Sequence, residues 1–446
     1  MSAPMPGPEV FDVVIFGASG FTGKYVIREA LKFLSPNASP LRTLALAGRS
    51  RERVAAALSW AASPGPVPDV PILVADASDP ASFTKVASRV KMVAAACAEA
   101  GVHCLDIFGE PEFMERVEAD LHEVAVKNGS LIVSACGFAS TVADLGFLFH
   151  SRQWTPPSAP VSVVAYVNLE SSDRKIVGNF ATFESAVLGV ANTSQLQALR
   201  RFRPRPAKPS IPGPPPPKGS LMIEHDKALG LWAMKLPSAD TVVVKRTLAK
   251  VTEHPEGLPC ADETSDFEKH RKEFWSSIKP AHFGVKTGSC SILGLVWCLS
   301  TAIFVGILAG FSFGRSLLLK FPEFFSLRFF RKTGPTEAEV SSASFKTWFV
   351  GRGYIDSAHA SECKPDKEIV TRVSGPEIGY ITTSIILIQC ALVLLSQRAN
   401  LPKGGVYTPG VVFGPTDLEK RLEENGLSFD LISTRTIPSE EQAHAS

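Results

Sequence analysis

Hydrophobic positions along the first 136 residues alternate between two patterns. Short apolar, β-branched runs, typical of strands, are separated by stretches in which apolar residues recur every three or four positions, typical of amphipathic helices. This alternation indicates a parallel sheet wrapped by crossover helices, an α/β fold. We expect strands at 11–16, 43–47, 71–75, 103–107 and 131–135, and helices at 22–33, 51–61, 81–100 and 111–127.

The first predicted strand runs into the loop Gly17-Ala18-Ser19-Gly20-Phe21-Thr22-Gly23, which opens the first predicted helix. Gly17 permits a tight turn, Gly20 allows the backbone to approach a pyrophosphate, and Gly23 allows close packing of the helix on the sheet. The helix N-terminus then faces the phosphates. All seven residues are therefore candidate cofactor-binding residues of a Rossmann-type dinucleotide-binding domain, with an ordinary glycine-containing loop as the alternative.

The ends of the second and third predicted strands bear on the type of dinucleotide. An NAD enzyme places an acid after the second strand, on the ribose hydroxyls, whereas this chain has Gly48-Arg49-Ser50-Arg51. Arg49, Ser50 and Arg51 offer donors that suit a 2′-phosphate, so NADP is favoured over NAD; a solvated helix start is the alternative. Asp76 is placed to accept from the adenine amine or to cap the following helix.

Candidate catalytic groups are few. None of the five tyrosines has a lysine four residues later, which excludes the Tyr-Lys chemistry of short-chain dehydrogenases. Asp106 and Glu110 flank the end of the predicted strand 103–107, where open α/β sheets bind ligands, and are the candidates for orienting a substrate or taking a proton; helix capping before Pro111 is the alternative. His103 begins that strand, at the opposite edge, and is interpreted as structural. No H-x-x-x-H pair is present, so no metal is predicted.

Length and composition narrow the organisation. A chain of 446 residues exceeds what one core comfortably fills, and we expect a dinucleotide-binding domain at 1–150, a mixed α/β second domain at 151–433 and a tail at 434–446. A formal charge of +2 gives no field to attract nucleic acid. The eight cysteines form no C-x-x-C pair and indicate a reducing, intracellular compartment, and no targeting peptide is visible at 1–9.

The second half is less regular. We expect strands at 161–169, 241–245 and 368–373 and a helix-like stretch at 180–201. Residues 203–218 contain eight prolines and predict an extended surface loop, more often a spacer than a peptide ligand. The polar stretch 253–279 is typical of a solvated connector or helix face.

An uncharged run of twenty-eight residues, 287–314, is long enough to cross a bilayer as a helix. Phenylalanines interleave with arginines and lysines in 315–332, a composition that suits a lipid interface. We therefore expect 287–332 to bind a membrane or lipid droplet surface, by a monotopic hairpin broken near Gly306 and Gly310 rather than by a single span. A buried core helix is the alternative. The run 381–395 is too short and too polar to change this view.

Ordered blocks of residues from Val10 to about Ser433 resemble the saccharopine dehydrogenase-like oxidoreductases. The resemblance implies a Rossmann domain with a mixed α/β second domain and a membrane, lipid droplet or mitochondrial location. It also implies an NAD(P)-linked activity in lipid or glycolipid metabolism rather than saccharopine cleavage. The blocks are 14–23, 47–50, 106–110, 320–322, 334–336, 375–377 and 401–410.

Two departures from the family pattern stand out. Between Lys91 and Val93 the family has an apolar strand and a Gly-Pro turn; here we expect one longer crossover helix, as a genuine variant or through a mistaken exon boundary. That strand normally lies beside the first one, so its loss threatens hydride chemistry more than phosphate binding. In the block 137–144, Ala139 and Val142 replace an acid and a proline.

Three hypotheses follow. The first is a membrane-associated NADP-linked oxidoreductase acting on a small or lipid-derived substrate. The second is an NADP-binding protein with impaired catalysis, and the third is a membrane or lipid droplet adaptor that uses a Rossmann scaffold.

Overall fold

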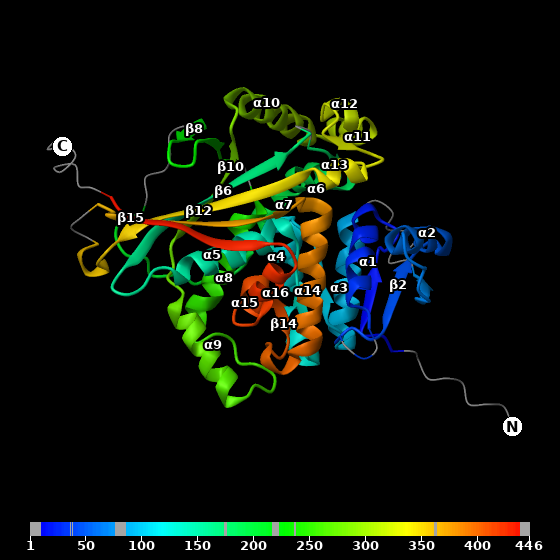
Figure 1. Ribbon diagram of the computed structural model, residues 1–446, viewed down its shortest axis with the longest axis horizontal. Helices are drawn as coiled ribbons and strands as arrows, with labels where there is room; N and C mark the ends of the chain where they lie inside the picture. The colour runs from blue at the N-terminus through cyan, green and yellow to red at the C-terminus, as the bar shows by residue number, and fades with distance from the viewer. Residues whose placement is uncertain are drawn as a thin grey trace.

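The computed structural model describes residues 10–35, 37, 39–75, 86–173, 176–215, 223–235, 238–360 and 364–437. Its strands form a seven-stranded mixed sheet, two three-stranded parallel sheets and a short two-stranded pair. A small N-terminal lobe lies at one end of the molecule and the long strands of the large sheet extend to the other (Figure 1). The chain is thus an α/β protein that combines parallel Rossmann-type strands with a mixed sheet.

The N-terminal lobe contains the first three predicted strands, all parallel: β1 (Val13–Phe16), β2 (Leu44–Gly48) and β3 (Ile72–Val74). The central strand β2 is buried along its whole length, as expected of a parallel strand covered on both faces. Helices α1 (Phe21–Phe33) and α2 (Arg51–Ala62) agree with the predicted ones to within a residue at each end.

A second parallel sheet contains β4 (Cys104–Leu105) and β5 (Leu131–Val133), both shorter than predicted. Its third strand, β14 (Gly405–Tyr407), comes from the far end of the chain and pairs with β5. The predicted helices 81–100 and 111–127 appear as α3 (Val86–Ala100), within the described residues, and α4 (Pro111–Asn128).

Within the described residues, no strand joins the two parallel sheets. Helix α3 continues through residues 91–93, where the family pattern would place a strand, so the expected longer helix is confirmed over its described part. In the described structure β1 pairs with β2 alone and β4 with β5 alone. The side chains of Val14 and Phe16 are consequently 47% and 45% exposed, unusual for the first strand of a parallel sheet.

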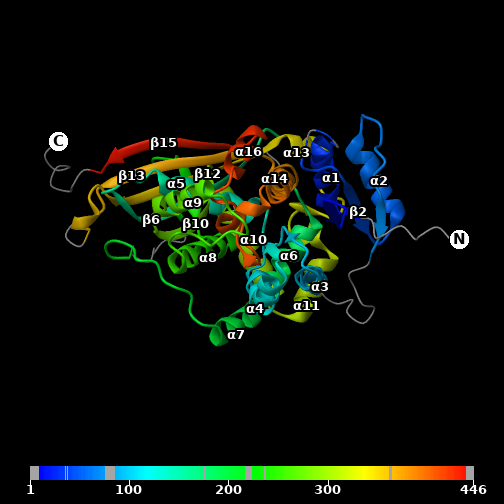
Figure 2. The same ribbon diagram turned by 90° about the horizontal axis from the view of Figure 1, so that it is seen from below.

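Helix α14 (Thr383–Ser396) connects the two parallel sheets by packing. Its Ile388 and Leu392 belong to the same apolar cluster as Val26 and Leu46 of the lobe, and it also contacts β4. In both views α14 lies between α1 and the strands of the large sheet (Figure 1, Figure 2). Because α14 is mostly buried, its apolar composition is that of a core helix.

The large sheet has the order β15-β13-β12-β6-β10-β9-β8. The predicted strands 161–169 and 368–373 are confirmed within β6 (Ala159–Ser171) and β13 (Lys367–Pro376). Phe345 and Phe349 project from β12 (Ala343–Tyr354) into the main core. The remaining strands are β8 (Ile223–Asp226), β9 (Leu231–Met234), β10 (His282–Ser289) and β15 (Ser428–Thr436). Helices around this sheet are α5 (Ala143–Arg152), α7 (Thr193–Phe202), α9 (Ser265–Ser277), α13 (Glu337–Ser341), α15 (Pro409–Phe413) and α16 (Leu418–Glu424).

The predicted strand 241–245 is wrong, because these residues lie in helix α8 (Ala239–Glu253). Three consecutive valines favoured a strand, but the buried positions include Val243, Val244, Thr247 and Leu248, which form one helical face. Ser238 caps the helix by accepting a hydrogen bond from the Asp240 amide at 3.1 Å. Burial of one face and a cap thus override the local β propensity.

The apolar segment forms a helical hairpin on the outside of the molecule. Helix α10 (Ile292–Ala309) has a mean hydropathy of 2.4, yet only 11% of this window is buried, so the buried core alternative is wrong. Helix α11 (Ser312–Lys320) folds back on α10, and α12 (Pro322–Phe325) follows. The chain leaves the large sheet at β10, forms β11 (Phe330–Arg331), which pairs with β7 (Gly178–Asn179) in the separate two-stranded sheet, and re-enters the large sheet at β12. We call the segment α10–α12 the apolar hairpin; it lies along one outer edge of Figure 1.

Candidate cofactor and substrate site

The glycine-rich loop has the geometry that its sequence predicts. Gly17 has a φ of +77°, a conformation that favours glycine. A Cβ on Gly23 would lie 2.5 Å from the Gly17 carbonyl oxygen and 2.9 Å from that of Ala18, so only glycine fits there. Gly20 caps α1 without a side chain, and its amide donates to the Gly17 carbonyl at 2.9 Å. The loop is a tight turn that brings backbone directly against the start of α1.

The N-terminus of α1 is suited to an anion. No side chain caps it and its first turn contains no acid. Gly17, Ser19 and Gly20 are exposed, whereas Ala18 is buried. Exposed, uncapped helix amides together with the helix dipole favour phosphate oxygens. The residues present therefore fit the pyrophosphate of a dinucleotide.

Phe21 and Thr22 are half-buried at the start of α1. The Phe21 ring lies 4.8 Å from that of Tyr380, and a Cβ on Gly334 would overlap it. Lys24 places its ammonium group 4.2 Å from the centroids of the Phe21 and Trp60 rings. Phe21 thus holds the loop against the second half of the chain. Gly334 of the block 334–336 leaves the room that the Phe21 ring needs.

The donors after β2 are partly engaged in local structure. Ser50 caps α2 by accepting from the Arg53 amide at 3.3 Å and donates to Glu52 at 2.7 Å. Arg51 donates to the Ile72 carbonyl at 2.9 Å. Arg49 is exposed at the strand end. Asp76 lies outside the described residues.

Asp106 joins the ends of β4 and β5. Its Oδ1 accepts hydrogen bonds from the amides of Phe108 at 2.9 Å and Ala135 at 3.0 Å, while Oδ2 has no hydrogen-bond partner in the described structure. Ala135 has a φ of +65°, rare for a residue with a side chain. Burial raises the pKa of Asp106 despite these hydrogen bonds.

Glu110 precedes α4 but does not cap it with its side chain. Instead, Oε1 accepts a hydrogen bond from the hydroxyl of Ser185, on α6 (Phe180–Ala191), and Oε2 is buried without a hydrogen-bond partner in the described structure. Burial raises the pKa of Glu110, and the nearby Asp106 raises it further. The structure therefore brings the two candidate carboxyl groups near each other, each with one buried oxygen that has no hydrogen-bond partner among the described residues.

Sequence reasoning missed three polar groups near this edge of the sheet: Ser185, Asp144 and Asp240. Burial raises the pKa of Asp144 to about 6 and that of Asp240 to about 7. Asp144 Oδ2 accepts from Thr247 at 2.8 Å and from the Gly410 amide at 2.7 Å. One feature of the sequence could have pointed to Asp144. It belongs to the block 137–144 and Gly410 to the block 401–410, and the hydrogen bond between the two residues joins these blocks in the fold.

His103 is structural, as expected. The Leu131 amide donates to Nδ1 of His103 at 3.1 Å, and Nε of Arg398 lies 3.0 Å from Nε2. Burial lowers the pKa of His103, which keeps the ring a neutral acceptor.

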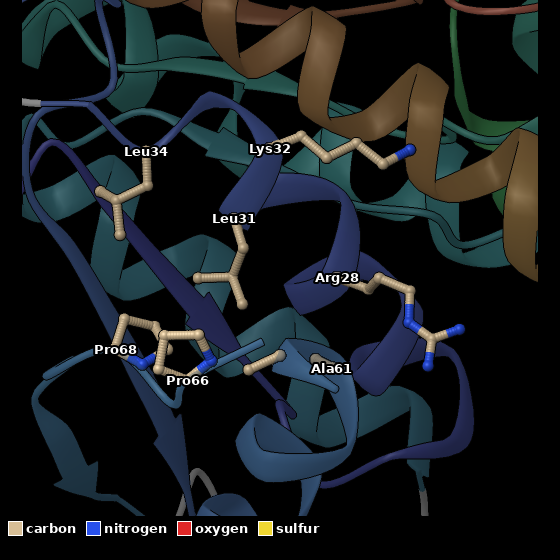
Figure 3. A pocket seen from close by; sticks show the side chains of 8 residues that line it. Arg28, Leu31, Lys32, Leu34, Ala61, Pro66 and Pro68 are labelled. Carbon is tan, nitrogen blue, oxygen red and sulfur yellow. The ribbon is translucent and has the colours of Figure 1, made fainter. Parts of the chain in front are cut away.

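A pocket of about 390 Å³ lies between the C-terminal halves of α1 and α2, lined by Leu31, Leu34, Pro66 and Pro68 with Arg28 and Lys32 nearby (Figure 3). In a parallel sheet with crossover helices, helix C-termini lie at the edge opposite the strand ends. This pocket is therefore separate from the glycine-rich loop and from the carboxyl groups of Asp106 and Glu110.

The glycine-rich loop, the parallel strands and the mixed sheet define an α/β protein with Rossmann-type strands. No protein-family model matches the chain. A probable mitochondrial saccharopine dehydrogenase-like oxidoreductase of Arabidopsis thaliana is 57% identical over 449 residues, covering 96% of this chain and 98% of that protein. The saccharopine dehydrogenase-like oxidoreductase of Homo sapiens is 32% identical over 447 residues, with the same coverage.

A lipid droplet localized protein of Caenorhabditis elegans is 29% identical over 450 residues, covering 95% of this chain and 98% of that protein. The identity to the plant and human proteins over nearly the whole chain shows the family. The chain belongs to the saccharopine dehydrogenase-like oxidoreductases.

Proposed function

We propose that this chain is a membrane-associated, NADP-dependent oxidoreductase that acts on a lipid-derived substrate rather than on saccharopine. The observation that carries the proposal is the geometry of the glycine-rich loop 17–23, which we call the phosphate loop. Gly17 has a backbone conformation that favours glycine and Gly23 occupies a position where only glycine fits, in front of an uncapped helix N-terminus. Exposed Arg49 at the end of β2, where no acid stands, favours the 2′-phosphate of NADP.

Asp106 and Glu110 would supply acid–base chemistry next to the nicotinamide, which supplies the hydride when bound. Burial raises the pKa of both carboxyl groups, which favours the protonated form that a general acid needs. Each has an oxygen without a partner in the described structure. Glu110 is the nearer to a helix start and less buried, so we assign it the proton transfer and Asp106 the orientation of the strand ends.

The apolar hairpin supports membrane association. Exposed apolar side chains form a stripe along α10 that includes Leu293, Trp297, Phe304 and Ile307. Phe313 and Phe324 extend this surface onto the following helices, where they are 73% and 74% exposed. A contiguous apolar surface of this kind marks an interaction site.

Charge and topology favour a lipid leaflet as the partner. Lys320, Arg328 and Lys332 are exposed beside the apolar surface, where they suit anionic head groups. Both ends of the hairpin return to the same fold, so monotopic insertion accounts for them without dividing a sheet. The lipid droplet location named for the nematode relative and the mitochondrial location named for the plant relative agree with an intracellular membrane surface.

One observation favours a second function, NADP binding without hydride transfer. The sheet is interrupted between β1 and β4, where the nicotinamide half of a dinucleotide would cross. The phosphate loop lies on the intact side of this interruption. Cofactor binding is therefore better supported than turnover.

The deciding experiment is a fluorescence titration of the detergent-purified chain with NADPH and NADH. We expect saturable binding, tighter for NADPH, and its loss in Gly20→Asp, whose carboxylate would occupy the pyrophosphate position. Ser59→Asp adds the same charge on an exposed face of the lobe and serves as the control.

Loss of binding in Gly20→Asp but not in Ser59→Asp supports both nucleotide-dependent functions, and NADPH oxidation with lipid carbonyl compounds then separates them. Absence of NADPH binding by the unaltered chain would refute both and leave the membrane adaptor.

A further inference from the structure

One helix contacts both the candidate acid group and the apolar hairpin. Helix α6 follows directly after β7, whose residues pair with Phe330 and Arg331 at the end of the hairpin. Asn179 caps the helix by accepting from the Ala181 amide at 2.9 Å. Its own amide donates to the Tyr380 hydroxyl at 2.6 Å. The start of α6 is therefore fixed by backbone pairing to β11, the strand that follows the hairpin.

The two contacts occupy opposite faces of α6. Phe183 and Val187 are four residues apart and share a face, which is buried against Ala309 of α10 and Leu318 of α11. Ser185 lies midway between them in sequence, about 200° around the helix from each, and donates to Glu110. A rigid helix with these two faces transmits a displacement of one contact to the other.

The hairpin holds α6 firmly. Val187, Ala309 and Leu318 are fully buried, and the Phe183 ring lies 5.4 Å from that of Phe330. A Cβ on Gly178 would overlap the Phe330 ring, so the two segments are in close contact. Closely packed interfaces of this kind move as units rather than deforming gradually.

Glu110, by contrast, has few polar neighbours. Asp106, which is buried, is the titratable group that acts on the half-buried Glu110. Glu115 and Arg200, on the neighbouring α4 and α7, pair with each other at 3.0 Å. The Ser185 hydroxyl is the side-chain donor to Glu110 in the described structure, and it comes from the helix that the hairpin holds.

We propose that Ser185 is a positioning residue for Glu110 and that α6 transmits the seating of the apolar hairpin on a lipid leaflet to that carboxyl group. The proposal rests on the membrane association proposed above. In the free protein Ser185 holds Oε1 of Glu110. When the hairpin enters a leaflet, α6 moves with it, the hydrogen bond lengthens, and Glu110 becomes available to a substrate.

Infrared titration of the full chain in detergent-free buffer tests the positioning role of Ser185. The protonated-carboxyl band that disappears in Glu110→Gln belongs to Glu110, and its midpoint is followed against pH. Because the Ser185 hydrogen bond favours the ionised carboxylate, we expect the midpoint to rise in Ser185→Ala and to return to the original value in Ser185→Thr. Ser194→Ala, at an exposed serine on α7, is the control. An unchanged midpoint in Ser185→Ala would overturn the positioning role.

Phosphatidylcholine vesicles with and without phosphatidylserine test whether α6 transmits the insertion of the hairpin to Glu110. We expect vesicles that bind the chain in cosedimentation to raise the Glu110 midpoint toward that of Ser185→Ala. Val187→Ala should bind vesicles equally while losing the shift, because it loosens the contact between α6 and the hairpin. Vesicle binding without a shift would overturn the transmission, whereas failure to bind vesicles would refute the membrane association itself.

Discussion

At the scale of single residues, the buried carboxyl group of Asp144 connects three helices. Asp144 receives the Gly410 amide and the Thr247 hydroxyl on one oxygen, while its other oxygen has no hydrogen-bond partner in the described structure. A Cβ on Gly410 would lie 2.5 Å from that carboxyl group. The pair ties α5, α8 and α15 together, and a glycine is needed for the approach.

The raised pKa values of Asp144 and Asp240 predict a pH dependence of stability. Both groups start from a usual value of 3.8, and burial raises them to about 6 and about 7. The folded state therefore binds more protons than the unfolded state above about pH 4, so the free energy of unfolding falls as pH rises through that window. A shift of two units corresponds to about 3 kcal/mol.

Asp144→Asn and Asp240→Asn should each flatten this fall, measured as the free energy of unfolding in urea from about pH 4 to about pH 8. Exposed Asp69→Asn should leave the profile unchanged. A profile in the two buried-site variants that is as steep as that of the unaltered chain would show that neither carboxyl group titrates in this range.

At the scale of elements, the apolar hairpin differs most from an ordinary surface. Phe304 and Ile307 of α10 are 51% and 63% exposed. Phe304 stacks on Phe325 of the same hairpin at 6.2 Å, and both side chains are more than half exposed, so Phe304→Glu and Ile307→Glu should lower thermal stability only slightly. Moving each apolar side chain into lipid is worth about 1.5–3 kcal/mol, so the double variant should weaken vesicle binding by at least about 100-fold.

Cosedimentation with phosphatidylserine-containing vesicles measures this change. Phe202→Glu is the matched control, since Phe202 is 89% exposed on α7, outside the hairpin. Equal binding by the double variant and the control would place membrane contact elsewhere on the chain.

At the scale of the whole molecule, the interrupted sheet separates an N-terminal lobe from the rest. The lobe is held by the packing of α14 against α1 and by side chains such as Trp60, which donates to Glu337 at 2.8 Å, rather than by strand pairing across the interruption. A unit joined by side-chain contacts alone opens at lower free energy than one in a continuous sheet.

Native-state hydrogen exchange should therefore show β1 and β2 opening together before β6 and β12 exchange. NADPH should slow the opening, because a ligand that binds only the docked lobe stabilises it. Simultaneous exchange of all four strands would instead indicate one cooperative unit.

The sequence by itself determined the elements whose pattern is local. The phosphate loop, α1, α2 and α4 follow from glycine spacing, helical periodicity and flanking turn residues, which act over a few positions. The absence of extended residues around 91–93 likewise predicted the continuous α3. The uncharged run 287–314 predicted a membrane-binding segment with a buried core helix as the alternative, and the structure decided between them, because 11% of the α10 window is buried against 67% of the window that contains α14.

Only the tertiary structure decided which distant groups meet. Ser185 lies 75 positions from Glu110, and Gly410 lies 266 positions from Asp144. The same holds for α8, where burial of one face outweighed a run of valines. Contacts of this kind depend on which faces of distant elements become buried together. The hydrophobic pattern of the sequence predicts the apolar face of each element but not the element that packs against it.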